Sequence, residues 1–146
     1  FNLILAGLVA GIVLGIWLGY NPENFSAQTY VEQQQHVISA LNTLMPLLGL
    51  ITIVLTLVSA FLQKSRGPAF AMLILAAVLF ITSGLVTRFG NQPVNALVMT
   101  WDKAAIPDNW TELRDQWWFF HTIRGITSLL AFALIGWVYT YRPTSK

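Results

Sequence analysis

Four long stretches without a charged residue constrain what this chain can fold into. All six acidic and all eight basic residues lie outside residues 1–20, 37–62, 69–87 and 125–141. The hydrocarbon core of a membrane is about 30 Å thick, and a helix of roughly 20 apolar residues crosses it. A soluble surface would need about a quarter of all residues to be charged, whereas 10% are charged here. The sequence therefore predicts an integral, multi-pass membrane protein that is all-α.

The four stretches predict a transmembrane four-helix bundle that forms a single domain over residues 1–146. Its spans are expected near residues 3–20, 37–62, 69–87 and 120–141. The first span is longer than a typical signal core and is followed by three others, so we expect a retained helix that ends at Asn21-Pro22. The second helix should start near residue 26 or 27, and Pro46 should kink it because proline removes one backbone hydrogen bond.

Glycine recurs at every fourth position of the first span. The four glycines are Gly7, Gly11, Gly15 and Gly19. They would share one helix face, and such a stripe of small residues lets a neighbouring backbone approach closely in membranes. We therefore expect this face to contact another helix, and we expect Gly11→Leu to disrupt that packing.

A polar segment, residues 88–116, separates the third and fourth spans and is rich in tryptophan. Its tryptophans, with those that follow it, are Trp101, Trp110, Trp117 and Trp118. An amphipathic helix over about 93–103 and a fourth helix that starts near Thr111 would let the segment lie along the membrane interface. Most of its tryptophans are typical of an aromatic belt at the membrane–water interface, and the alternative is that they line a substrate-binding pocket.

The distribution of Lys and Arg predicts the orientation of the chain. The turn at residues 64–66 contains two of them and the C-terminal tail contains Arg142 and Lys146, whereas residues 21–36 contain none. By the positive-inside rule, both termini are expected to face the cytoplasm, and the 21–36 and 88–118 segments are expected to face outward.

Polar side chains near membrane depth are costly unless they are paired, so they are candidates for function. The predicted second helix carries a stripe of them at helical spacing: Glu32, Gln35, His36, Ser39, Asn42 and Thr43. The fourth helix carries another: Trp117, His121, Arg124 and Ser128. Helix three ends at the same membrane face, so Arg88, Asn91 and Asn95 can join the two stripes. We expect the charged and imidazole groups of both stripes to converge, with Glu32 as the ionic partner of Arg124.

Structural roles are alternatives for several of these residues. Arg88 can extend to the lipid headgroups. A Glu32–Arg124 pair can hold helices two and four together without any ligand. Asn91 and Asn95 can cap a turn and the helix that follows it.

Glu32, His36 and His121 are the residues that a metal site would need. Two histidines and one carboxylate suit iron or another divalent metal, and a bis-histidine haem is a further alternative. No HExxH motif, glycine-rich phosphate loop or nucleophile elbow accompanies them, and the chain has no cysteine. The sequence therefore favours a site without a metal. Its basic residues are scattered, which argues against nucleic-acid binding.

Together, these motifs resemble a known family. Residues 88–95 contain an N-x-P-x-N turn, and residues 30–42 form a polar start to the second helix. Downstream come a tryptophan and a W-x-x-x-H-x-x-R helix start, at Trp101, Trp117, His121 and Arg124. This layout resembles the anthrone-oxygenase-like family of small four-span membrane proteins.

The resemblance implies an oxygenase that converts an electron-rich polycyclic phenol of the anthrone type into a quinone, without a bound metal or organic cofactor. His121 would be the base, and Arg124 or Arg88 would stabilise the anion. Glu32 would orient a histidine. Groups that would bind the substrate are Trp117, Arg88, Asn91, Asn95, His36, Asn42 and Trp101.

A non-catalytic membrane module is the competing hypothesis. Such a module would be an accessory subunit or a lipid- or quinone-binding component of a larger membrane complex. The partners expected under the two hypotheses are membrane lipid, a hydrophobic aromatic or quinone ligand, other membrane subunits and a second copy of this chain.

Overall fold

Helices make up most of residues 1–140, which are the residues that the computed structural model describes. Four helical segments are long and apolar enough to cross a membrane, so the predicted all-α, multi-pass bundle is confirmed. Their main helices are α1 (Asn2–Gly19), α3 (Leu44–Leu62), α4 (Gly67–Val86) and α6 (Trp110–Thr140). The predicted end of the fourth span, at residue 141, lies outside the described residues.

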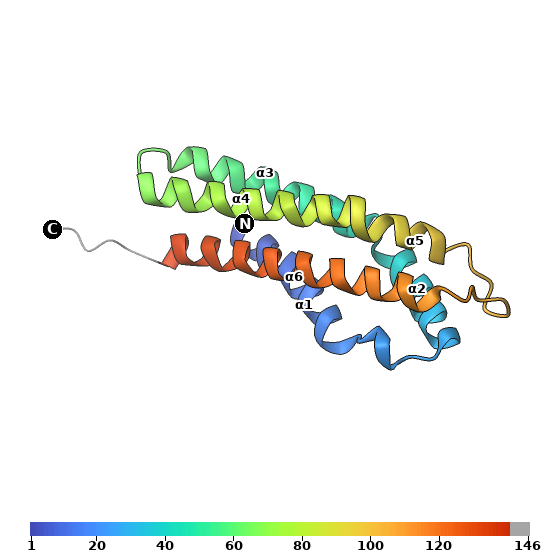
Figure 1. Ribbon diagram of the computed structural model, residues 1–146. Coiled ribbons are helices and arrows are strands. Elements are labelled where there is room, and N and C mark those ends of the chain that lie inside the picture. Colours follow the sequence, from blue (N-terminus) through green and yellow to red (C-terminus); the bar gives the residue numbers. More distant parts are fainter. Residues whose placement is uncertain (141–146) are drawn as a thin grey trace.

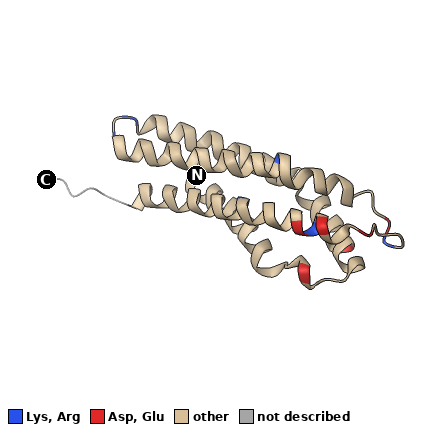
Figure 2. Cartoon of the chain, viewed as in Figure 1, with Lys and Arg blue, Asp and Glu red and all other residues tan. Residues whose placement is uncertain are grey.

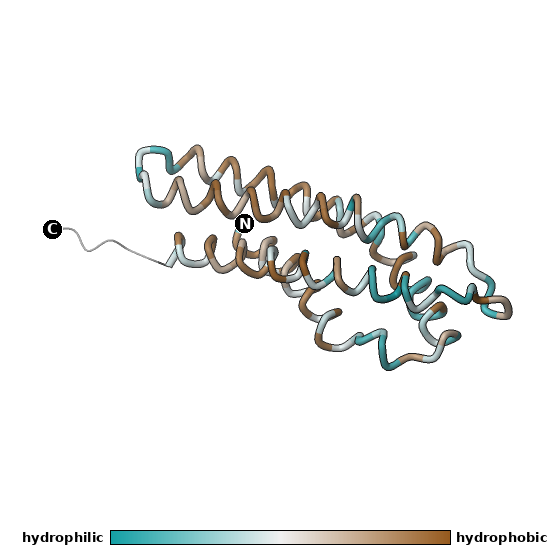
Figure 3. The backbone as a smooth tube through the Cα atoms, viewed as in Figure 1, coloured by the Kyte–Doolittle hydropathy of each residue, from teal (hydrophilic) through white to brown (hydrophobic). Residues whose placement is uncertain are grey.

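Shorter elements gather at one end of the bundle (Figure 1). They are η1 (Pro22–Asn24), α2 (Ala27–Leu41), the π-helical turn η2 (Thr87–Asn91) and α5 (Gln92–Val98). We call residues 20–42 and 92–118 the cap, and the other described residues the membrane bundle. Charged residues concentrate in the cap and in the turn between α3 and α4 (Figure 2), whereas the long helices are apolar (Figure 3). This distribution is the one that a membrane-spanning protein requires.

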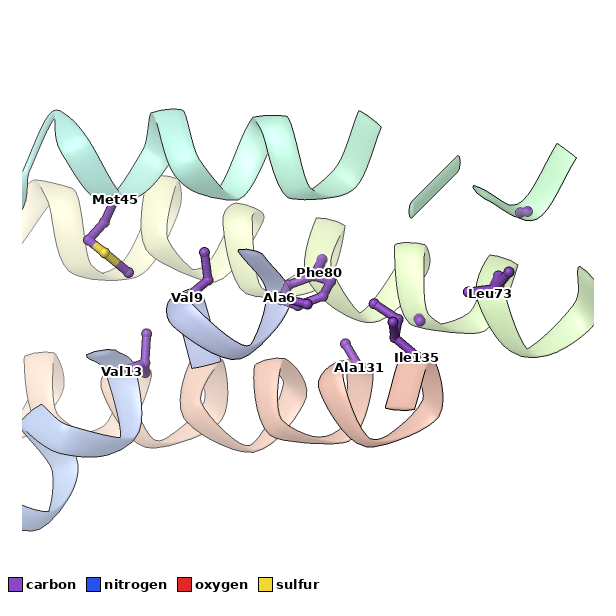
Figure 4. Packing of buried hydrophobic residues seen from close by; sticks show 10 residues of the cluster. Ala6, Val9, Val13, Met45, Leu73, Phe80, Ala131 and Ile135 are labelled. Atoms are coloured by element: carbon purple, nitrogen blue, oxygen red, sulfur yellow. The ribbon is translucent and has the colours of Figure 1, made fainter. Parts of the chain in front are cut away.

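The long helices follow one another around the bundle in the order α1, α3, α4, α6, because each of them packs on the helices before and after it. α3 and α4 run side by side as a hairpin (Figure 1). Side chains from all four helices point into the core between them (Figure 4). Several are alanines, which let the helices approach closely: Ala6, Ala60, Ala76 and Ala131.

The predicted role of the glycine face of α1 is wrong for three of its four residues. Only Gly7 lies against another helix, where an added Cβ would be 3.0 Å from Cε2 of Phe132. An added Cβ at Gly11, Gly15 or Gly19 would meet no atom within 4 Å. The reason is that α1 packs through its alanine and valine face, which leaves most of the glycine stripe outside the core of a single chain. Gly11→Leu is therefore expected to be tolerated.

The predicted second helix is divided into two helices. α2 begins at Ala27, as expected, and Ser26 caps it by accepting a hydrogen bond from the Thr29 backbone N–H. The helix is interrupted at Asn42 and Thr43, and α3 begins at Leu44. Pro46 explains the place of the break, because a proline ring clashes with the carbonyl of the residue four positions earlier.

The predicted turn after Arg88 is also wrong, because the helix continues. α4 passes through the π-helical turn η2 directly into α5, which ends at Val98 rather than at residue 103. Pro93 lies in the first turn of α5, where a missing N–H is tolerated. An ordered loop follows, with Asp102 and Ala105 forming an isolated β-bridge, and α6 begins at Trp110, next to its predicted start.

Candidate functional site

Two asparagines hold Trp117 where η2 and α5 meet α6, one by its backbone and one by its indole. The Asn91 side chain donates a hydrogen bond to the Trp117 backbone oxygen over 2.9 Å, and Trp117 Nε1 donates to Asn95 Oδ1 over 2.8 Å. Asn95 Nδ2 donates in turn to Asn42 Oδ1 over 3.0 Å. The network therefore fixes three elements against one another: the end of α2, the η2–α5 segment and the start of α6. The N-x-P-x-N segment thus bridges helices rather than only capping one.

A glycine allows this close approach. A Cβ added at Gly90 would lie 2.4 Å from Cγ of Phe120, which no real side chain tolerates. The π-helical turn inserts one extra residue per turn, and such turns recur at functional sites. Sequence reasoning did not single out Gly90, although it lies inside the quoted 88–95 motif.

His121 is fully buried, and both of its ring nitrogens have partners. Nε2 is 3.1 Å from the Val13 carbonyl oxygen, which can only accept, so Nε2 carries the proton. Nδ1 accepts from Nε and Nη2 of Arg124, at 3.1 and 2.9 Å. Arginine can only donate, so the ring is the neutral Nε2–H tautomer. The Val13 carbonyl belongs to α1, and no motif in the sequence indicated it.

The His121 ring is part of an aromatic stack. It lies nearly parallel to Trp117, with centroids 5.0 Å apart, and to Trp118, with centroids 5.6 Å apart. Tyr20 closes the outer side of Trp117 edge-on, and its hydroxyl donates to Gln34. Trp117 is only 2% exposed, so the stack is buried where the cap meets the membrane bundle.

Arg124 is a partly buried cation without a carboxylate partner. Its only hydrogen-bond acceptor among the described side chains is His121 Nδ1, and no acidic group of residues 1–140 lies within 4.0 Å of it. A guanidinium carries five N–H donors, so several of them are free to bind a ligand. A positive charge at this depth is costly unless it is neutralised.

Two adjoining hollows share Arg124 as a lining residue. The smaller one, about 30 Å³, lies on the cap side against Asn42, Asn95 and Trp117. The larger one, about 240 Å³, lies within the membrane bundle, between all four long helices and η2. We call this larger hollow the cleft. It is mostly apolar, with Arg88 as its second charged residue.

Glu32 and His36 lie apart from this arrangement. Glu32 forms an exposed ion pair with Lys103, with 3.3 Å between Oε1 and Nζ. The predicted Glu32–Arg124 pair is therefore wrong, because a lysine from the cap loop takes the carboxylate. His36 is exposed on α2. Within residues 1–140, no cluster of three or more His, Asp or Glu side chains could hold a metal ion.

Arg88 and Trp101 have peripheral positions. Arg88 is exposed at the rim of the cleft, where Nη1 donates to Gln92 Oε1 over 3.4 Å. Trp101 packs against the aromatic core of the cap, and its backbone oxygen accepts a hydrogen bond from Gln35. Of the predicted site residues, the structure therefore brings six together: Asn42, Asn91, Asn95, Trp117, His121 and Arg124.

The fold and the site define a small multi-pass helical membrane protein with a buried arginine–histidine pair beside an apolar cleft. Within that class the chain belongs to the anthrone oxygenase family, whose sequence model matches residues 35–134. The match includes all six of the predicted residues that the structure brings together, and it excludes Val13 and Glu32. Searches among curated proteins and among solved structures gave no match.

Proposed function

We propose that this protein binds the anion of an electron-rich phenol or enol of the anthrone class and oxidises it with molecular oxygen. One observation carries the proposal: Arg124 is a cation without a counter-ion, and it lines an apolar cleft. An anionic ligand would neutralise this charge where an unpaired one is most costly. Family membership supports the same chemistry.

Substrate deprotonation would use the hydrogen bond between His121 and Arg124. In the free protein the only basic lone pair of His121, on Nδ1, is occupied by the guanidinium. When the substrate O–H approaches Arg124, the guanidinium N–H groups can turn to that oxygen, and Nδ1 then receives the proton. The resulting anion lies beside Arg124, so deprotonation and charge neutralisation occur in one exchange.

Oxidation then proceeds from the anion. The enolate carbon transfers electrons to O₂ and forms a C–O bond, and protonated His121 returns its proton to the terminal oxygen. Loss of water from the hydroperoxide forms the new carbonyl. One oxygen atom of O₂ enters the quinone and the other leaves as water, which balances the four-electron oxidation of a CH₂ group.

The surrounding groups would position the reacting pair. The Val13 carbonyl orients His121, which is the role that sequence reasoning had given to Glu32. Trp117 and its asparagine partners hold the aromatic stack above the cleft. Arg88 supplies a second positive charge at the rim.

Aerobic and anaerobic turnover of anthrone, with protein in lipid nanodiscs, tests the proposal. Arg124→Gln keeps two N–H donors but removes the charge, and we expect kcat/KM to fall by about 100-fold or more. His121→Phe should lower kcat while keeping a ring in the stack. Arg66→Gln, in the turn at the other end, is the charge-matched control. Oxidation by Arg124→Gln at the wild-type rate would refute the proposal.

The same purified protein distinguishes the oxygenase from the non-catalytic membrane module. Stoichiometric co-purification with another membrane protein, without turnover of any phenol, would favour an accessory or quinone-binding role. A lone chain with oxygen-dependent turnover favours the enzyme.

We also propose that the cap faces outward and both termini face the cytoplasm, on the basis of the Lys and Arg distribution. The chain contains no cysteine, so single cysteines introduced at Ser65 and Ala104 can report sidedness. In intact cells, a membrane-impermeant maleimide should label Ala104→Cys and not Ser65→Cys.

A further inference from the structure

We propose that the cleft receives the apolar body of a membrane-dissolved amphiphilic anion, which enters sideways from the lipid between α3 and α4. This inference rests on the proposed anion site at Arg124. It adds the substrate class, an amphiphile with an ionisable head and a hydrocarbon tail, and its route of access.

The walls of the cleft show which side is open. Its lining residues from α1, Val9 and Val13, are 5% and 3% exposed, so that side is closed. The exposed lining residues come from α3 and from the α4–η2 segment: Pro46, Leu50, Gly84 and Arg88. The opening therefore faces outward between these two helices, at a level where the surroundings are lipid.

Two glycines widen this opening. Gly49 of α3 and Gly84 of α4 both line the cleft, and an added Cβ at either would meet no atom within 4 Å. Leu50, beside Gly49, is 59% exposed on a helix that is long and apolar enough to cross a membrane. The absence of a side chain at these two positions therefore leaves room at the mouth of the cleft for an entering ligand.

The route from the water side is narrow by comparison. The hollow on the cap side has a volume of about 30 Å³, which is one water molecule's share of liquid water. Trp117, Asn95 and Asn42 line it and are hydrogen-bonded to one another. A cavity of about 150 Å³ holds a benzene molecule, so the cleft, at about 240 Å³, has room for a larger apolar group.

Polarity within the cleft determines how an amphiphile would lie. Arg124, Arg88 and Gln92 line it together with apolar groups such as Leu50, Ile53 and Phe80. The Ser83 hydroxyl already pairs with Ser128 over 3.0 Å. Charge complementarity therefore places an anionic head at the arginines and a hydrocarbon tail along α3 and α4.

A photoreactive phenol with a long alkyl chain, carrying a diazirine in that chain, tests this inference in phosphatidylcholine nanodiscs. After irradiation, we expect labelled peptides from α3 and α4. Gly84→Leu should reduce labelling at least tenfold, because its side chain would fill the opening. Gly11→Leu, an equal change on an exposed face of α1, should label like the wild type. The O-methylated probe, which cannot ionise, should label several-fold less than the free phenol.

Wild-type labelling of Gly84→Leu, or labelling confined to cap peptides, would overturn the lateral route. The same samples separate this inference from the proposed function. If the cleft is labelled but no variant oxidises a phenol, the oxygenase proposal fails and the amphiphile site stands. If Gly84→Leu oxidises a tailed phenol as fast as the wild type does, the lateral route fails and the oxygenase stands.

Discussion

The cap and the membrane bundle use polar side chains in opposite ways. In the bundle, most hydroxyls bond to a carbonyl of their own helix, as Thr52 does to Leu48 and Thr82 does to Val78. In the cap, polar side chains cross between elements, as in the links that join Asn42, Asn95 and Trp117. Helix positions are therefore set mainly by close packing in the bundle and by directed hydrogen bonds in the cap.

The site lies where the two regions meet. His121 and Arg124 belong to the bundle part of α6, and Trp117 belongs to its cap part. The apolar cleft therefore ends at a charged group: polar residues of the cap line the small hollow on one side of Arg124, and the bundle supplies the apolar walls on the other.

The largest expected effect concerns the cap-side end of the bundle, where η2 packs against α6. Gly90→Ala should destabilise the protein by about 1–3 kcal/mol, because the new methyl group overlaps the Phe120 ring. Thermal unfolding in detergent measures it. Gly15→Ala, in open space, is the control, and Phe120→Ala should rescue Gly90→Ala in the double variant. Unchanged stability of Gly90→Ala would show that η2 and α6 can move apart at no cost.

Removal of a cap hydrogen bond should have the next largest effect. Asn95→Ala leaves the Trp117 indole N–H without its acceptor, at a cost of about 1–3 kcal/mol. The double variant with Trp117→Phe should lose less than the sum of the two single changes. Gln28→Ala, exposed on α2, is the control. If the losses of stability in the two single variants added up exactly in the double variant, the hydrogen bond between Asn95 and Trp117 would not be what positions α5 against α6.

Removal of a hydrogen bond between two helices of the bundle should lower the stability of the protein by less. The single Thr56 hydroxyl proton has two acceptors within reach, Asn2 Oδ1 on α1 at 3.0 Å and the Thr52 carbonyl oxygen of its own helix at 2.7 Å. Thr56→Val therefore removes the link to α1. Hydrogen bonds between membrane helices average about 0.6 kcal/mol. Thr82→Val, which removes only a bond within its own helix, is the comparison. A loss as large as that of Asn95→Ala would erase the distinction between the regions.

The smallest effect is expected for Tyr30→Phe at neutral pH. The Tyr30 hydroxyl is buried without a partner among the described residues, and burial raises the pKa of this group above its ordinary value. The unfolded chain ionises near its ordinary pKa of about 10. The protonated Tyr30 hydroxyl therefore contributes to the stability of the folded state fully below about pH 10, and this contribution is lost as the pH rises through the higher pKa of the folded state. Unfolding followed from pH 7 to 11 should show a shallower alkaline loss for Tyr30→Phe, and identical profiles would contradict it.

The sequence predicted part of the site because helical spacing is local. Trp117, His121 and Arg124 follow one another at intervals of four and three, so their shared face of α6 could be read directly. Their partners could not be read in this way. The Glu32 carboxylate pairs with Lys103, and His121 is oriented by the Val13 carbonyl, so both pairs join residues far apart in the chain.

By itself, the sequence determined the four membrane-crossing helices, the polar cap at one end and the family to which the chain belongs. Hydropathy adds up along a segment, so these properties need no knowledge of distant residues. Only the tertiary structure decided which face of α1 is buried, where the π-helical turn brings Gly90 against Phe120, and that Arg124 lines an apolar cleft. Contacts of this kind depend on how four helices pack together, and packing is a property of the whole chain.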